Sequence, residues 1–135
     1  MFEVIAYTPV YEEQVMRLIR NEGEDWSIYW EEPNATKYRR ALQTSPTYLA
    51  LKEGTVCGYC RVIVDVLSVY IGDLLVDASC RGNALGRKLM ERVQQDYPTL
   101  PVYIMSGNDG YYKSLGYSKE GSIYMVNNGV ECQEE

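Results

Sequence analysis

The sequence contains no histidine among its 135 residues. This absence excludes catalytic triads built on a histidine base and metal sites that need an imidazole ligand. The formal net charge is −6, with 13 lysines and arginines against 19 acidic residues, which disfavours nucleic acid as a partner. Proton transfer in this chain must therefore rely on carboxylates, tyrosines, a terminus or ordered water.

Long apolar runs are also missing. The most apolar region, residues 62–76, is interrupted by Asp65 and Asp73, and the N-terminus lacks the basic start and apolar run of a secretory signal. We therefore expect a cytoplasmic protein with no membrane partner. With 46% hydrophobic and 24% charged residues, the chain is expected to form a single domain over residues 1–135, frayed from about residue 128.

Of the four cysteines, Cys57 and Cys60 form a Cys-x-x-Cys pair. A redox pair of this kind needs a helix N-terminus to lower the thiol pKa, whereas the β-branched run that follows predicts a strand. Alternation along a strand would direct the two sulfurs to opposite faces. Cys80 and Cys132 stand alone, so no zinc site is completed. We interpret these residues as structural thiols and expect no metal.

Hydrophobic periodicity predicts a mixed α/β fold in which helices cover a sheet, with the order β-α-α-β-β-β-α-β-α-β. Strands are expected at residues 2–8, 47–54, 55–66, 68–77, 101–107 and 117–128. Helices are expected at residues 11–23, 34–43, 85–97 and 109–116. Residues 24–33 are expected to form a loop, with Asn34 as the N-cap of the helix that follows. The nearly continuous apolar strand at 68–77 is expected to be central in the sheet.

The stretch RGNALG, residues 81–86, joins that strand to the third helix. Small residues at a helix start let a ligand approach the backbone, and the free N–H groups and the helix dipole there bind an anion such as a pyrophosphate. Arg81 and Arg87 flank the turn and can add charge-assisted hydrogen bonds. The P-loop and dinucleotide fingerprints do not match. A tight turn whose glycines only permit close packing is the alternative.

In its context, this junction resembles the acetyl-CoA-binding signature of the GNAT superfamily of N-acetyltransferases. The segment YYKSLGY, residues 111–117, is similar to a second motif of that family. The resemblance covers about residues 2–126 and implies a GNAT-like fold, with acetyl-CoA as cosubstrate and no metal. Three features depart from the family pattern: Ala84 replaces the usual first glycine, the segment before Tyr112 is short, and only one long strand follows.

The resemblance implies that the fourth and fifth strands splay apart around the pantetheine arm. The Leu74 N–H would then polarise the thioester carbonyl, and the Val76 backbone would pair with pantetheine. Asn108 would reach a pantetheine amide, with a loop-capping role as the alternative. The residues expected to bind acetyl-CoA are Leu74, Leu75, Val76, Arg81, Gly82, Asn83, Ala84, Leu85, Gly86, Arg87 and Asn108.

The resemblance also implies a general acid at Tyr112, whose alternative is an interior aromatic of a short helix. Asp73 is the nearest candidate for the base. Strand parity places Asp73 opposite Leu74, and Tyr70 and Gly72 on the face of Leu74, unless a bulge intervenes. A water chain that leads to residues 24–32 is an equal alternative.

The acidic and aromatic loop is expected to bind a small cationic amine, with a solvated acidic loop as the alternative. The residues expected to bind this acceptor are Asp25, Trp26, Tyr29 and Asp73. The preferred function is N-acetyl transfer from acetyl-CoA to a primary amine by direct attack in a ternary complex. A non-catalytic acyl-CoA-binding sensor is the second hypothesis. A homodimer is compatible with the resemblance.

Overall fold

The computed structural model describes residues 1–127, in two compact units that comprise Met1–Ile104 and Met105 onward. The first unit contains one five-stranded sheet with the order β1-β2-β3-β4-β5. Its strands are β1 (Phe2–Ala6), β2 (Thr47–Lys52), β3 (Thr55–Val64), β4 (Val69–Val76) and β5 (Val102–Ile104). Neighbouring strands are antiparallel except β4 and β5, which are parallel. The mixed α/β class is confirmed, but β3 and not β4 is the central strand.

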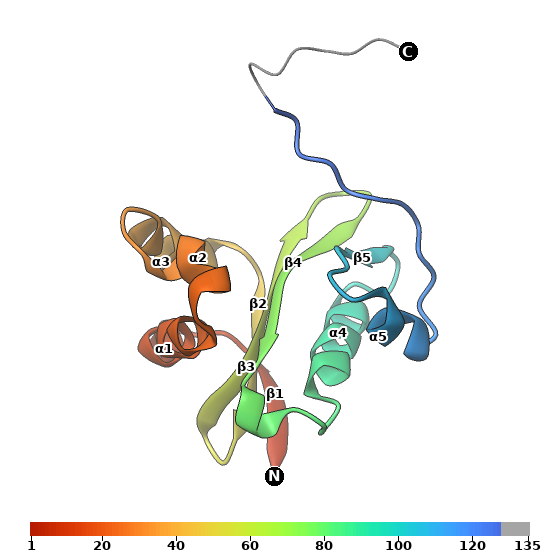
Figure 1. The fold of residues 1–135 in the computed structure, drawn as a ribbon. Helices are drawn as coiled ribbons and strands as arrows, with labels where there is room; N and C mark the ends of the chain where they lie inside the picture. The colour runs from red at the N-terminus through yellow and green to blue at the C-terminus, as the bar shows by residue number, and fades with distance from the viewer. Residues whose placement is uncertain (128–135) are drawn as a thin grey trace. The chain divides into compact units, whose positions relative to one another are not determined.

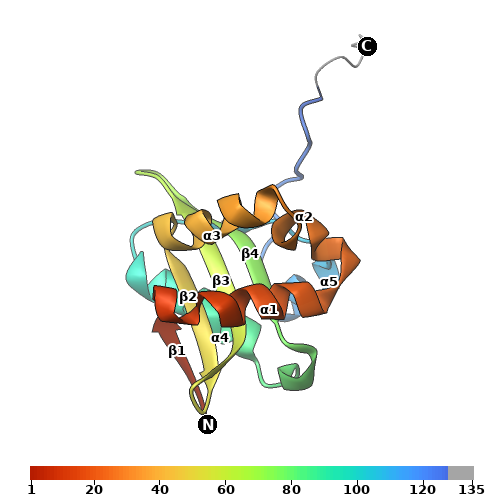
Figure 2. The ribbon, with the colours of Figure 1, turned by 90° about the vertical axis from the view of Figure 1, so that its left-hand side faces the viewer.

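Helices cover both faces of this sheet (Figure 1). One face carries α1 (Glu12–Glu22), α2 (Ser27–Trp30) and α3 (Asn34–Thr44), and the other carries α4 (Leu85–Asp96). Figure 2 shows α1 and α3 crossing in front of β2 and β3. Three short 3-10 turns complete the unit: η1 (Pro9–Tyr11), η2 (Glu24–Trp26) and η3 (Ala78–Cys80). The core between α1–α3 and the sheet includes Val15, Leu18, Ile19, Tyr38, Leu42, Leu49, Leu51, Val56, Tyr59 and Leu75.

The helix boundaries follow local signals with two corrections. Gly23 ends α1 at a φ of 101°, which a residue with a side chain rarely adopts. Residues 24–33 are not simply a loop, because they contain η2 and α2. Asn34 is not the N-cap of α3; instead the Glu32 carboxylate accepts a hydrogen bond from the Thr36 N–H at 2.9 Å. This contact satisfies a backbone donor in the first turn of α3.

Two register shifts interrupt the side-chain alternation in the sheet. On β4, Asp73 lies opposite Arg61 and Ile71 opposite Val62, so Gly72 has no partner on β3. Asp73 therefore lies on the sheet face that α1–α3 cover, and Leu74 lies on the other face, as parity predicts. The same bulge places Tyr70 on the face of Asp73, which makes the expectation that Tyr70 shares the face of Leu74 wrong.

The second shift lies where Cys57 has no partner on β2. Across it, Val56 and Tyr59 are three residues apart yet both pack in the core beneath α1–α3. Plain alternation therefore fails in this part of β3, and the parity argument that separated the Cys57 and Cys60 sulfurs is wrong. Both thiols are buried and free.

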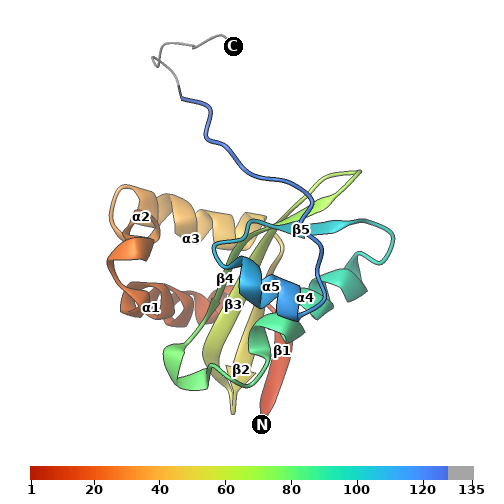
Figure 3. The same cartoon turned by 45° about the vertical axis from the view of Figure 1, so that its right-hand side comes forward.

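The strands β4 and β5 pair only over three residues each. Val69–Ile71 pair with Val102–Ile104, and the Gly72 bulge lies directly beyond this pairing. The rest of β4 has β3 on one side and no strand partner on the other in the part of the chain that the structure describes. Figure 3 shows β4 continuing past its short contact with β5.

The second unit contains α5 (Asp109–Ser114), as predicted. The Asn108 side chain caps it by accepting a hydrogen bond from the Tyr111 N–H at 3.2 Å. Residues 117–127 form no strand, so the strand expected at 117–128 is wrong over the described part. The polar tail, with Cys132, lies outside the described residues. Through residue 127, none of the helices has the length and apolar character that a membrane span requires.

Candidate functional site

Within residues 1–127, no strand pairs with the outer edge of β4 beyond Ile71, and the backbone groups on this edge are available to a ligand strand. The Asp77 N–H donates to the Cys57 carbonyl at 2.8 Å, which shows that this residue points toward β3. Because backbone direction alternates along a strand, the N–H and C=O groups of Leu74 and Val76 point to the opposite edge. That edge is the one that β5 leaves after Ile71. An extended ligand with amide groups can hydrogen-bond there as an additional strand.

The turn before α4 is open to a ligand as well. Gly82 has a φ of 89°, and a Cβ added there would meet no atom within 4 Å. Ala84 adopts the left-handed conformation at φ 58° and gives α4 no side-chain cap. The Asn83 side chain turns away and donates to the Cys80 carbonyl at 2.9 Å. The first N–H groups of α4, including those of Leu85 and Gly86, therefore remain available to donate hydrogen bonds to an anion.

These two features are adjacent in the chain and fit the two halves of acetyl-CoA. The edge of β4 suits the amide-containing pantetheine arm, and the uncapped start of α4 suits the pyrophosphate. Of the predicted strand residues, Leu74 and Val76 contribute backbone groups to this edge, whereas the Leu75 backbone points toward β3 and its side chain lies in the core. That these residues and the turn at 81–87 bind acetyl-CoA stays a prediction.

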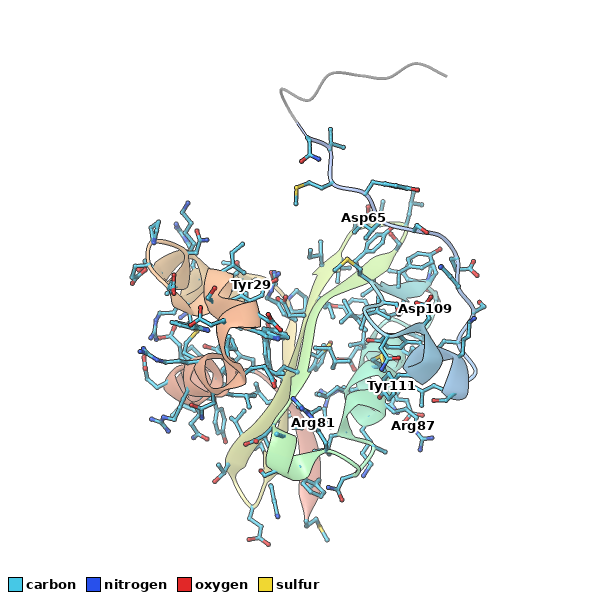
Figure 4. The ribbon with its side chains drawn as sticks, in the orientation of Figure 1. Tyr29, Asp65, Arg81, Arg87, Asp109 and Tyr111 are labelled. Carbon is cyan, nitrogen blue, oxygen red and sulfur yellow. The ribbon has the colours of Figure 1, made fainter. Side chains whose placement is uncertain are left out.

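Arg81 is already engaged within the protein. Its Nε donates to the Val76 carbonyl at 3.1 Å, and its Nη2 donates to both oxygens of Glu22 at 2.6 and 2.9 Å. Arg87 lies 3.9 Å from Glu91 on the exposed side of α4. Figure 4 shows Arg81 beside the end of β4 and Arg87 projecting away from it. The two arginines therefore do not meet at the turn in this conformation.

Asp73 belongs to a buried hydrogen-bonded network. Its Oδ2 accepts hydrogen bonds from Arg61 Nε at 2.6 Å and from the Tyr38 hydroxyl at 2.7 Å. The Tyr38 and Tyr59 hydroxyls are also 2.7 Å apart. Burial, followed by the charge of Asp73, raises the pKa of Tyr38, so this tyrosine is neutral at physiological pH. A Cβ at Gly72 would lie 3.2 Å from Arg61 Nη2, so the absence of a side chain at this position gives room to the guanidinium.

Two residues of the segment 24–33 lie beside this network. The Tyr29 ring lies against Tyr38 with centroids 4.7 Å apart, and Trp26 lies against Tyr29 at 5.6 Å. Burial, and then the charge of Asp73, raise the pKa of Tyr29. Asp25 is exposed on η2. Tyr29 belongs to the segment 24–32 and lies beside Asp73, so the two candidates that the sequence offered as proton acceptors are neighbours.

The remaining predicted residues lie in the second unit. Asn108 has the capping role that was its alternative assignment. Tyr112 lies within α5, and its ring contacts Tyr111 at a centroid distance of 5.0 Å and Tyr117 at 6.4 Å. The catalytic assignment of Tyr112 stays a prediction from the motif.

Cys57 lies near Cys80, which is part of η3 directly before the turn. Burial, and then this neighbouring thiol, raise the pKa of Cys57 to about 11. Burial also raises the pKa of Cys60 to about 12. Both thiols are therefore protonated near neutral pH, and neither has the lowered pKa of a redox cysteine.

Sequence reasoning missed the side chains that pair with Arg81 and with Asp73. Glu22 and Arg81 are 59 residues apart, and Tyr38 and Asp73 are 35 apart, so no local pattern connects them. Arg61 did give a signal, because a charge at the start of an apolar strand segment needs a counter-charge when it is buried. Asp73 was the matching acid on the neighbouring strand.

Comparison with known proteins supplies the family context. The sequence profile described as the acetyltransferase (GNAT) family matches residues 12–117. No curated protein sequence matches the chain. Among solved structures, a GNAT family acetyltransferase from Streptococcus pneumoniae TIGR4 is 23% identical with a TM-score of 0.73, covering 95% of this chain and 99% of that one.

Two further structures share the fold at lower identity. The protein AAC(6')-Iy, solved with the bisubstrate analogue CoA-S-monomethyl-acetylneamine, is 12% identical with a TM-score of 0.73, covering 96% of this chain and 99% of that one. Glucosamine-6-phosphate N-acetyltransferase from Arabidopsis thaliana is 18% identical with a TM-score of 0.70, and the corresponding coverages are 96% and 99%.

Proposed function

The chain belongs to the acetyltransferase (GNAT) family, and we propose that it transfers the acetyl group of acetyl-CoA to a primary amine of a small cationic acceptor. Membership of this family makes it an acetyl-CoA-dependent acyltransferase. The observation that supports the proposal most strongly is the unpaired edge of β4 beside the uncapped start of α4. The acceptor, the direct attack in a ternary complex and the residue roles below are parts of the proposal.

Acetyl-CoA supplies an acetyl group activated as a thioester. The Val76 backbone would pair with the pantetheine arm, and the N–H groups from Arg81 to Arg87 would hold the pyrophosphate. The Leu74 N–H, which points to the same edge as Val76, would donate to the carbonyl oxygen as negative charge develops on it. A preorganised donor in this role contributes about 10²–10³ in rate.

Tyr112 would protonate the departing thiolate. Its position in the YYKSLGY motif supports this role, and a general acid of this kind contributes about 10²–10⁴ in rate. Tyr111 precedes it on the same helix and offers a matched comparison.

Asp73 would be the final acceptor of the ammonium proton. Its side chain is only 2% exposed, so a bulky amine does not reach it directly in this conformation. Tyr29 is partly exposed and lies beside the network, so the proton would pass by way of its hydroxyl or an adjacent water. This route unites the two alternatives that the sequence left open.

The segment with Asp25, Trp26 and Tyr29 would bind the acceptor. The aromatic rings provide apolar and cation–π surface, and Asp25 is exposed for a cation. The names of two structural neighbours include acetylneamine and glucosamine 6-phosphate, which supports an amine-bearing small molecule as the acceptor class.

The test is release of coenzyme A from acetyl-CoA with a panel of polyamines, amino sugars and amino acids. We expect amine-dependent release, a fall in kcat of about 10²-fold or more in Tyr112→Phe and little change in Tyr111→Phe. Full activity in Tyr112→Phe would refute its role as the acid. Acetyl-CoA binding without release for any amine would favour the non-catalytic sensor instead.

The proton route has its own test in Tyr29→Phe. We expect kcat to fall about ten-fold or more, with a changed pH–rate profile and an unchanged acetyl-CoA affinity. An unchanged kcat at every pH would remove Tyr29 from the route.

A further inference from the structure

Arg81 connects three parts of the first unit: α1, the edge of β4 and the turn before α4. Its guanidinium donates to Glu22, the last residue of α1, and to the carbonyl of Val76. The Val76 carbonyl belongs to the unpaired edge, because Asp77, the next residue, points toward β3. The arginine side chain therefore occupies a backbone acceptor that an extended ligand would use.

The position of Glu22 calls for an explanation. A carboxylate at the C-terminal end of a helix is unfavourable, because the helix dipole is negative there. The Glu22 side chain is nevertheless only 21% exposed, against 53% for Arg81, and both of its oxygens accept from Nη2. The contact with Arg81 compensates for this unfavourable position and neutralises the arginine.

We propose that Glu22 competes with the pyrophosphate of acetyl-CoA for Arg81 and so sets the affinity for the cosubstrate. In the free protein, Glu22 holds Arg81 across the edge of β4. Release of Arg81 frees the Val76 carbonyl for a ligand amide and provides a positive charge beside Gly82, where the backbone is open. Glu22 is thus an affinity-determining residue and not a catalytic one. This inference rests on the proposed acetyl-CoA site.

Glu22→Gln retains the size of the side chain and removes its charge. Exposed ion pairs contribute up to about five-fold to an equilibrium, so we expect acetyl-CoA to bind about two- to five-fold more tightly to this variant. Glu13→Gln makes the same change of net charge elsewhere on α1, where Glu13 pairs with Arg39, and is expected to leave the affinity unchanged.

The experiment is isothermal titration of the full chain with acetyl-CoA for the wild type, Glu22→Gln, Glu13→Gln, Arg81→Ala and the double variant Glu22→Gln/Arg81→Ala. Tighter binding in Glu22→Gln that is absent in the Arg81→Ala background supports the proposal, because a general structural effect would not depend on Arg81.

Unchanged or weaker binding in Glu22→Gln overturns the competition while leaving the acetyl-CoA site in place. A tightening that persists without Arg81, or that Glu13→Gln reproduces, also overturns it. A wild type that binds no acetyl-CoA at millimolar concentration overturns the cosubstrate site and the competition together.

Discussion

Replacing Asp73 with asparagine should greatly destabilise the fold. Asn retains the shape of the side chain but removes the charge that faces Arg61, whose side chain is 17% exposed against 2% for Asp73. Loss of one partner of a buried ion pair leaves the other charge uncompensated and costs about 3–5 kcal/mol. For a chain of this length, that cost corresponds to a fall in melting temperature of roughly 10–20 °C.

The assay is thermal and urea denaturation followed by circular dichroism. Glu91→Gln is the control, because it breaks the pair between Arg87 and Glu91, whose side chains are 51% and 49% exposed, and should cost less than about 0.5 kcal/mol. Tyr38→Phe removes the hydrogen bond to Asp73 together with the contact to the Tyr59 hydroxyl, and should cost about 1.5–3 kcal/mol. A loss below about 1 kcal/mol in Asp73→Asn would show that Asp73 and Arg61 do not form a buried pair.

Three further predictions address the turn, the thiols and the second face of the sheet. Ala84→Gly removes the strain of a side chain in the left-handed backbone conformation and should raise the melting temperature by about 3 °C without weakening acetyl-CoA binding. A lower melting temperature would contradict this. Burial raises the pKa of Cys57 to about 11 and of Cys60 to about 12. The contribution of the two protonated thiols to the free energy of unfolding is therefore complete below pH 9 and is lost as the pH rises toward those values. The urea midpoint should therefore be level from pH 7 to 8 and fall above about pH 9, and a constant midpoint to pH 11 would refute the assignment. Tyr48→Phe removes the 2.7 Å hydrogen bond to Asp96 and should cost about 1 kcal/mol by urea denaturation, and no loss would show that this bond contributes nothing.

Local signals in the sequence predicted most of the first unit. The apolar stripe of α1 and the glycine at its end are sufficient to place that helix, and Glu53-Gly54 is sufficient to place the hairpin between β2 and β3. These features depend on residues a few positions apart. The junction at residues 81–86 was identified for the same reason, because its small residues and the helix that follows are adjacent in the chain.

The errors arose where an interaction depends on a distant partner. The bulge at Gly72 reversed the predicted face of Tyr70, and the guanidinium of Arg61 from the neighbouring strand lies beside Gly72. The apolar run at residues 123–126 suggests a strand, yet such a run does not provide the hydrogen-bonding partner that a strand requires. The pairing of Glu22 with Arg81 was not predictable, since a single sequence does not indicate which charges meet.

The most direct test of the account is isothermal titration of the wild-type protein with acetyl-CoA, with free coenzyme A as the control ligand and Arg81→Ala as the control variant. We expect saturable binding that weakens by about 1.5–3 kcal/mol in Arg81→Ala, the scale of hydrogen bonds to a charged group. Absence of binding to the wild type at millimolar acetyl-CoA would contradict the assignment of the β4 edge and the α4 start as the cosubstrate site.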